Sequence, residues 1–397
     1  MIPKITVLMP VHNGARHLPE AIASTLKQTF DDFEFLIIDD ASTDDSVSLI
    51  DTFNDERIRL VRNETNLGQV VSQNKGLQLA RGEYIARLDQ DDSSSPNRFA
   101  RQVAVLDAEP SVAVVGTWMY AVDSEGDIID VWQGRHLNDL ADYLFAILTN
   151  SLPLYHPSVM FRREAVLQLD GYDETLPFCE DNDLWRRLAL ARHDARVVAE
   201  PLTSYRVHEG QQSVSQAKIQ RKNHVFSQER FVQSFTDEYT VRSLRLFMTC
   251  GSLFGGDFWD SCSSLREARE LCVQLESMLG TMRSQLQLNT WEYSKLVHLV
   301  RCHAAKVAGR AWRRDIGRQL RASRPIYLYA MGGGFSVLSS VHTWLYPLIY
   351  VAAPILPMLR NIKRIALRSV HLQRWYSLLR KWARRSNTLL SAYRKIY

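Results

Sequence analysis

Hydrophobic residues in roughly the first half of the chain alternate between two spacings, which together predict an α/β domain. Short runs rich in β-branched and aromatic residues, typical of buried strands, occupy residues 5–9, 33–38, 58–61 and 84–88. The segments between them repeat apolar residues every three or four positions, as amphipathic helices do, at residues 15–29, 47–53 and 70–80. This strand–helix rhythm predicts an open, mostly parallel sheet with helices on both faces.

The pattern changes after residue 215, where strand signals fade. Residues 216–324 are helical in pattern, and we expect them to form a helical extension of the domain over residues 1–215. Residues 325–359 contain no charged side chain, and their prolines argue against a single straight helix. Residues 360–397 are basic, with hydrophobic residues three, four or seven apart. We therefore treat 325–397 as a third, hydrophobic and basic region.

Charge is divided unevenly along the chain. The net charge of +4 combines an acidic excess in residues 1–300 with residues 301–397, where 19 Lys and Arg stand against one acid. An acidic body with a basic tail indicates a polyanionic partner surface, either anionic lipid or nucleic acid. No recognised nucleic-acid-binding motif is present, and the basic residues border apolar sequence, so we predict an anionic membrane surface and no nucleic acid.

The uncharged segment and the basic residues on both sides of it favour membrane attachment. Residues 335–353 are long enough for one spanning helix, but their serines and Pro347 favour a re-entrant or interfacial hairpin. Trp375 and Trp382 would then lie at headgroup depth. The alternative is a soluble helical domain whose uncharged part is its core. With no signal peptide and no CxxC pair, we expect peripheral or monotopic attachment at the cytoplasmic face of the plasma or inner membrane.

Acidic residues gather where two of the predicted strands end. Asp39 and Asp40 follow the second strand, and Asp89, Asp91 and Asp92 follow the fourth. Ligands of open α/β sheets bind at this edge, yet the chain has neither a dinucleotide-binding glycine fingerprint nor a P-loop. Carboxylates beside a diphosphate require a divalent cation between them, and Asp oxygens suit Mg²⁺ or Mn²⁺. Either acidic cluster alone is also explained by helix capping. The prediction of a cation site therefore depends on both clusters lying at strand ends.

Six segments, in order, resemble inverting glycosyltransferases of family 2, of the bacterial surface-polysaccharide type. They are PVHNG (10–14), IIDDASTDDS (37–46), NLGQVVSQNKGLQLARGEYIARLDQDD (66–92), HPSVMFRR (156–163), GYDETLPFCEDNDLWRRL (171–188) and YRVHEGQQS (205–213). The resemblance covers residues 4 to about 215. It implies a GT-A fold, with a Rossmann-like catalytic domain over residues 1–215, and sugar transfer that depends on a divalent metal ion.

The resemblance also implies which residues bind the donor and the metal. The nucleotide-sugar would contact residues at the strand ends and in the following loops, namely Pro10, Val11, His12, Asn13, Asp39, Asp40, Asn66, Gly68, Asn74 and Asp89. Asp91 would be the direct metal ligand of the Asp-x-Asp motif, with Asp89 beside it and His208 completing the shell. The alternative for His208 is a surface or packing role. Family members often carry an Arg where this chain has Gln73.

The Glu-Asp pair at residues 180–181 matches the catalytic pair of the family. Asp181 would be the general base that deprotonates the acceptor hydroxyl, with Glu180 as the second candidate or as a contact to donor-sugar hydroxyls. Acids at a helix N-terminus also interact favourably with the helix dipole, which is the non-catalytic alternative. His156 would face the cleft, and Trp185 would either stack on a sugar ring or pack in the core.

The resulting hypothesis is a metal-dependent inverting hexosyl- or N-acetylhexosaminyl-transferase. It would move a sugar from a nucleoside-diphosphate sugar, by family resemblance a UDP-sugar, to a hydroxyl of a lipid-linked glycan or surface-polysaccharide precursor. The alternative from another class is a non-catalytic nucleotide-sugar-binding scaffold of the same fold. Paired carboxylates also occur in glycoside hydrolases, but the order of the six motifs argues against hydrolysis.

Overall fold

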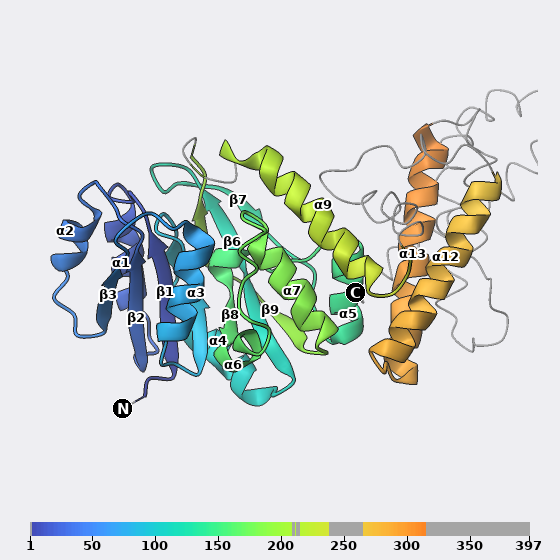
Figure 1. Ribbon diagram of the computed structural model, residues 1–397, viewed down its shortest axis with the longest axis horizontal. Coiled ribbons are helices and arrows are strands. Elements are labelled where there is room, and N and C mark those ends of the chain that lie inside the picture. Colours follow the sequence, from blue (N-terminus) through green and yellow to red (C-terminus); the bar gives the residue numbers. More distant parts are fainter. Residues whose placement is uncertain (1, 209–210, 212–214, 238–264, 315–397) are drawn as a thin grey trace, which may run out of the picture. The chain divides into compact units, whose positions relative to one another are not determined.

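The computed structural model describes residues 2–208, 211, 215–237 and 265–314. The chain divides into two compact units, and the first comprises Met1–Phe235 with the short segment Ser284–Leu288. We describe the two units separately. The first is an α/β unit built on one large sheet with helices against it (Figure 1).

The N-terminal half of the sheet follows the predicted rhythm. Strands β1 (Ile5–Val11), β2 (Phe33–Asp39), β3 (Ile58–Arg62) and β4 (Tyr84–Arg87) lie in the order β3-β2-β1-β4. All of these neighbours pair in parallel, with Ile5 opposite both Phe33 and Tyr84. Every residue of β1, β2 and β4 is buried, as expected for strands covered on both faces. The α/β prediction is confirmed.

The second half of the sheet is mixed, which differs from the mostly parallel sheet that the sequence predicts. β8 (Met160–Arg162) lies between β4 and β6 (Val112–Val122) and is antiparallel to both. β9 (Asp194–Arg206) is parallel to β6, whereas β5 (Ser93–Ser94) and β7 (Ile128–Trp132) pair in antiparallel fashion with β9 and β6. Because β8 runs against both neighbours, β4, β6 and β9 still point the same way. Their carboxyl ends therefore share one edge with those of β1 and β2.

Helices pack on both faces of this sheet. On one face, α1 (Leu18–Leu26) and α4 (Arg98–Ala108) bury apolar side chains against the alternate residues Ile5, Val7 and Met9 of β1. On the other face lies α3 (Gln69–Leu79), which approaches β1 closely at Gly76. A Cβ at Gly76 would lie 2.2 Å from Cδ1 of Leu8, so the close approach requires glycine.

The remaining helices of the first unit follow the later strands. They are α2 (Ser46–Asp51), α5 (Leu140–Leu148), the short 3₁₀ turn η1 (His156–Ser158), α6 (Arg163–Leu167), α7 (Glu180–Leu190) and α9 (Ala217–Gln233). Helix α9 packs against α7 and buries Phe231 and Val232. The first unit thus continues to Phe235, beyond the boundary at residue 215 that we expected.

The second unit contains the helices α12 (Leu265–Gln285) and α13 (Thr290–Arg314), as the helical pattern predicts. Asn289 starts α13 with a capping box. Its side chain accepts hydrogen bonds from the amides of Trp291 and Glu292, and the Glu292 carboxylate accepts one from the amide of Asn289. Within residues 2–208, 211, 215–237 and 265–314, no helix is long and apolar enough to cross a membrane. The predicted membrane-associated region, 325–397, lies outside the described residues.

Candidate active site

Asp40, at the end of β2, organises the loop that follows β3. Its side chain is almost fully buried, and it accepts hydrogen bonds from the Asn63 side chain (2.7 Å) and from the amides of Leu67 (2.9 Å) and Gly68 (2.8 Å). Burial raises the pKa of Asp40, but these hydrogen bonds outweigh burial and hold the pKa below its usual range. Gly68 has a φ of 90°, which favours glycine, and begins α3. Asp40 therefore fixes the shape of a predicted donor-binding loop.

His12, at the end of β1, joins this loop to the rest of the sheet edge. Its Nδ1 lies 2.8 Å from the carbonyl oxygen of Asp40 and must donate to it, which leaves Nε2 as an acceptor. The Asn66 side chain lies 3.0 Å from that Nε2. Asn13, with a φ of 49°, accepts a hydrogen bond from the amide of Thr43 at 2.8 Å. The structure thus brings the predicted donor residues of β1, β2 and the β3–α3 loop together at one edge.

Asn74 lies on α3 but contacts the other side of the site. Its side chain exchanges two hydrogen bonds with the backbone of Tyr172, at 2.8 and 2.9 Å. Asn74 therefore anchors the loop that leads to α7, and its predicted contact with the donor remains a prediction. Its neighbour Gln73 is fully buried, and no hydrogen-bond partner for its amide is found among the described residues.

The acidic end of β4 is held by two buried arginines that the sequence analysis did not single out. Arg87 donates to Oδ1 of Asp89 at 2.5 Å. The backbone amide of Arg206, on β9, donates to Asp92 at 2.9 Å, and its guanidinium donates to the carbonyl oxygen of Asp91 at 3.1 Å. Burial raises the pKa of Asp89 and of Asp92. The available signal for Arg87 was its position inside a predicted strand, all of whose β4 residues are buried, whereas Arg206 had none before its partners were known.

Asp91 and His208, which are 117 residues apart in the chain, face each other at this edge. Oδ2 of Asp91 lies 3.0 Å from Nε2 of His208, and the pairing of β5 with β9 brings the two segments together. No group of three or more His, Cys, Asp or Glu side chains among the described residues is arranged to hold a metal. The Asp91 carboxylate nevertheless fits Mg²⁺ or Mn²⁺, because these ions favour oxygen ligands and commonly take the rest from substrate phosphates and water. His208 lies beside this carboxylate.

The Glu-Asp pair opens α7. Glu180 is 5% exposed, and Oε2 of its carboxyl has no hydrogen-bond partner among the described residues. Burial, with the nearby charge of Asp181, raises the pKa of Glu180 to about 8. Burial also raises the pKa of Asp181, although hydrogen bonds from the amide (2.6 Å) and side chain (3.1 Å) of Asn182 lower it. Two adjacent carboxyls in different surroundings can hold different protonation states.

The buried phenol of Tyr172 links the two acidic groups. Burial raises its pKa, and the charges of Glu180, Asp181 and Asp89 raise it further, while Arg87 lowers it. Carboxylates from the acidic end of β4 and from the start of α7 therefore both act on the Tyr172 hydroxyl.

His156 and Trp185 lie on the inner side of this site. Nε2 of His156 lies 3.0 Å from the Tyr172 hydroxyl, and burial lowers the pKa of His156 well below its usual value, so the ring is neutral. Trp185 is fully buried and packs against His156 and Phe161, with ring centroids 6.4 and 6.2 Å apart. Of the two roles considered for Trp185, the structure shows core packing; sugar stacking is not possible because no face of the indole is exposed.

Comparisons with known proteins agree with this architecture. The profile "Glycosyl transferase family 2" matches residues 6–169. An uncharacterized glycosyltransferase of Methanocaldococcus jannaschii is 30% identical over 225 residues, which are 55% of this chain and 76% of that protein. The succinoglycan biosynthesis protein ExoO of Rhizobium meliloti is 27% identical over 298 residues, 72% of this chain and 82% of that protein.

The fold also resembles a solved structure. S. aureus TarS 1-349, in complex with UDP-GlcNAc, superimposes with a TM-score of 0.52 at 18% identity, over 83% of this chain and 90% of that one. This likeness concerns the fold, which is GT-A-like with a mixed sheet. The α7 and α9 segments lie beyond the part of the chain that the family profile matches.

Proposed function

Because this chain belongs to glycosyltransferase family 2, we propose that it is a metal-dependent, inverting transferase of surface-polysaccharide synthesis. It moves a hexosyl or N-acetylhexosaminyl group from a nucleoside-diphosphate sugar, with UDP-sugars as the first candidates, to a hydroxyl of a lipid-linked glycan or polysaccharide precursor. The name of ExoO supports polysaccharide synthesis. The UDP-GlcNAc complex of the structural neighbour is consistent with a nucleotide-sugar donor.

One observation supports the proposal: the charges of Glu180 and Asp181 and the charge of Asp89, two residues before Asp91, act on the same buried phenol, that of Tyr172. The Asp91–His208 pair offers ligands for the cation of a nucleoside diphosphate, and the Glu180–Asp181 pair offers a base for an acceptor. A hydrolase needs paired carboxyls but not a diphosphate-binding edge of this kind.

Each of these residues has its own role in the proposed reaction. Asp181 accepts the proton of the acceptor hydroxyl as the oxygen attacks the anomeric carbon, and a single in-line displacement inverts that carbon. Glu180, neutral below its pKa of about 8, donates a hydrogen bond to a donor-sugar hydroxyl. Asp91 and His208 would hold the divalent cation, which would stabilise the charge of the leaving nucleoside diphosphate. His12, Asn13 and the loop that Asp40 holds bind the nucleotide.

We further propose that residues 325–397 attach the enzyme to the cytoplasmic face of the membrane, where a lipid-linked acceptor is available. The support is their uncharged segment, the basic residues on both sides of it and their tryptophans.

A donor screen tests the proposed function. The purified full-length chain is incubated with UDP-glucose, UDP-galactose, UDP-GlcNAc or GDP-mannose, MnCl₂ and synthetic polyprenyl-diphosphate-linked saccharides, and the products are read by mass spectrometry. We expect the acceptor mass to rise by one sugar with one of these donors, and inversion at the anomeric carbon by NMR. Donor binding without any transfer would favour the scaffold hypothesis instead.

A further inference from the structure

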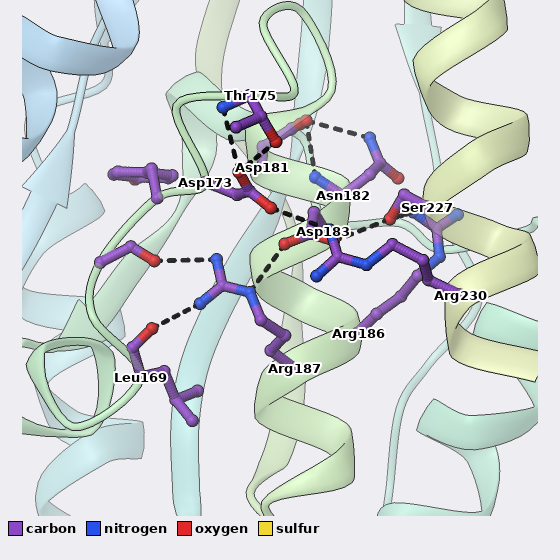
Figure 2. Close-up of polar contacts among 12 residues, drawn as sticks. Leu169, Asp173, Thr175, Asp181, Asn182, Asp183, Arg186, Arg187, Ser227 and Arg230 are labelled. Atoms are coloured by element: carbon purple, nitrogen blue, oxygen red, sulfur yellow. Dashed lines mark hydrogen bonds and ion pairs between the residues drawn. The ribbon is translucent and has the colours of Figure 1, made fainter. Parts of the chain in front are cut away.

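A buried carboxylate that the proposed chemistry does not use lies two residues after the base. Asp183 is in the first turn of α7 with Asp181 and is 3% exposed. Its Oδ2 accepts a hydrogen bond from Nε of Arg187 at 2.7 Å, and its Oδ1 accepts one from the hydroxyl of Ser227 at 3.1 Å (Figure 2). Asp183 therefore joins its own helix to α9, which carries Ser227.

The loop before α7 is attached to the same centre. Arg187 donates to the carbonyl oxygens of Leu169 (2.7 Å) and Gly171 (2.8 Å) in addition to Asp183 (Figure 2). Gly171 precedes Tyr172, whose hydroxyl lies 3.0 Å from Nε2 of His156 and whose pKa is raised by the charges of Glu180 and Asp181. One guanidinium thus fixes the loop and the helix start relative to each other, which a planar group with five donors can do and an ammonium group cannot.

Helix α9 makes further polar contacts with this assembly. Arg230 pairs with Asp173 of the loop at 2.8 Å and lies 3.9 Å from Oδ1 of Asp183. Ser227 also accepts a hydrogen bond from Arg186 of α7 at 3.1 Å (Figure 2). The first turn of α7 is therefore held from two sides, by the preceding loop and by α9.

We propose that Asp183 is a positioning residue through which α9 and the loop at residues 169–175 place the Asp181 carboxylate against the acceptor hydroxyl. The inference rests on the proposed role of Asp181 as the base. The Asp181 carboxylate accepts hydrogen bonds from Asn182, the next residue, so its position follows the position of the helical turn. That turn is set by Asp183 and its partners.

We expect this positioning to affect the rate because proton transfer and the attack of the acceptor oxygen are sensitive to small displacements. A shift of about 1 Å in a reacting group can cost about 100-fold in rate. Most of the proposed donor contacts lie at the ends of β1, β2 and β4, and only Glu180 adds one from the first turn of α7. Loosening this turn should therefore lower kcat by more than it raises the KM for the donor.

The test uses two variants of α9 in the full-length chain. Ser227→Ala removes the hydroxyl between Arg186 and Asp183 without changing any charge, and Arg230→Met removes the pairing with Asp173. Lys222→Met is the matched control, because Lys222 is an exposed cation on the same helix. Asp183→Asn is a stronger variant that keeps the shape of the side chain. Each is assayed with the donor and acceptor identified for the wild type, at saturating MnCl₂.

We expect kcat to fall about 5- to 20-fold in Ser227→Ala and Arg230→Met, with the donor KM within about twofold of the wild type. The acidic limb of the pH profile should move to lower pH in Ser227→Ala, because an Asp181 that gains solvent loses the burial that raises its pKa. The other charged or titratable groups around Asp181 are left in place by Ser227→Ala; they are Cys179, Glu180, Arg186 and Tyr172. Lys222→Met should behave as the wild type.

Hydrogen–deuterium exchange of the peptide spanning residues 176–188 provides a readout that does not need activity. We expect faster exchange there in Ser227→Ala and Arg230→Met than in Lys222→Met. Unchanged exchange at this peptide overturns the positioning role, even if the wild type transfers no sugar and the proposed function itself fails. Wild-type kcat in both α9 variants, with an active wild type, overturns the positioning role and leaves the proposed function standing.

Discussion

Glu180 gives a prediction that can be tested without knowing the substrate. Its carboxyl is 5% exposed, one oxygen has no hydrogen-bond partner among the described residues, and its pKa is raised from 4.5 to about 8. In the unfolded chain the same group ionises near pH 4.5. Between these two values the folded state keeps a proton that the unfolded state has released.

The stability of the wild type should consequently fall as the pH rises through this window. Below pH 4.5 both the folded and the unfolded state hold the proton, so Glu180 contributes no pH dependence. Above pH 4.5 the free energy of unfolding falls by about 1.4 kcal/mol per pH unit, until the folded group ionises near pH 8. At pH 7 the loss amounts to about 3 kcal/mol. Glu180→Gln keeps the size of the side chain and has no proton to lose, so it should be more stable than the wild type by that amount.

The assay is thermal unfolding of the full-length wild type and Glu180→Gln from pH 4.5 to 8.5. A change of 1 kcal/mol shifts the melting temperature of a domain of this size by about 2–4 °C, so we expect a difference of about 6–12 °C at pH 7 that shrinks toward zero at pH 4.5. Glu56→Gln, at an exposed carboxyl, is the matched control. A difference between Glu180→Gln and the wild type that does not change with pH would show that the proton is not held at Glu180.

Three further predictions concern the reaction and the membrane. Asp91→Ala should remove metal-dependent transfer while leaving the fold intact, because the cation loses a carboxylate ligand; full activity of this variant in chelator would contradict the metal role. Asp181→Asn should bind the donor, measured by calorimetry, but lose turnover, since an amide cannot accept the acceptor's proton; near-wild-type rates would rule it out as the base. The full-length chain should float with anionic liposomes at 1 M salt, where the Debye length is about 3 Å, and a chain ended before Pro325 should float less; a full-length chain that stays soluble without detergent and does not float would mean that residues 325–397 form a soluble domain.

Local patterns were sufficient for the elements from β1 to β4, but no individual element was predicted between residues 93 and 206. The four predicted strands agree closely with β1 to β4, because buried strands and amphipathic helices are both specified by neighbouring residues. The direction of β8 was not predictable in this way. An antiparallel strand between β4 and β6 depends on which strands pair over long sequence distances, and the spacing of hydrophobic residues does not contain that information.

In the site, too, residues within family motifs could be predicted, whereas residues whose roles depend on distant partners could not. The family resemblance placed Asp91, His208 and the pair at residues 180–181 among the functional residues, and the structure pairs Asp91 with His208. It did not single out Arg87 or Arg206, because a buried arginine acquires its role from distant carbonyl and carboxylate partners. Trp185 is the opposite case: its spacing from Asp181 was compatible with sugar stacking, but its burial depends on His156 and Phe161, which come from other elements.

The boundary of the catalytic unit follows from buried contacts rather than from the last strand. The strand pattern ends near residue 206, which is why residue 215 looked like the end of the domain. Helix α9 nevertheless buries Phe231 and Val232 in the first unit, and its Ser227 hydroxyl donates to the buried Asp183 carboxylate. Ending the chain at 215 would expose this apolar surface and leave a buried charge with one donor fewer, and each of these changes is costly. The part of the chain that holds the first turn of α7 therefore includes α9 and extends to Phe235.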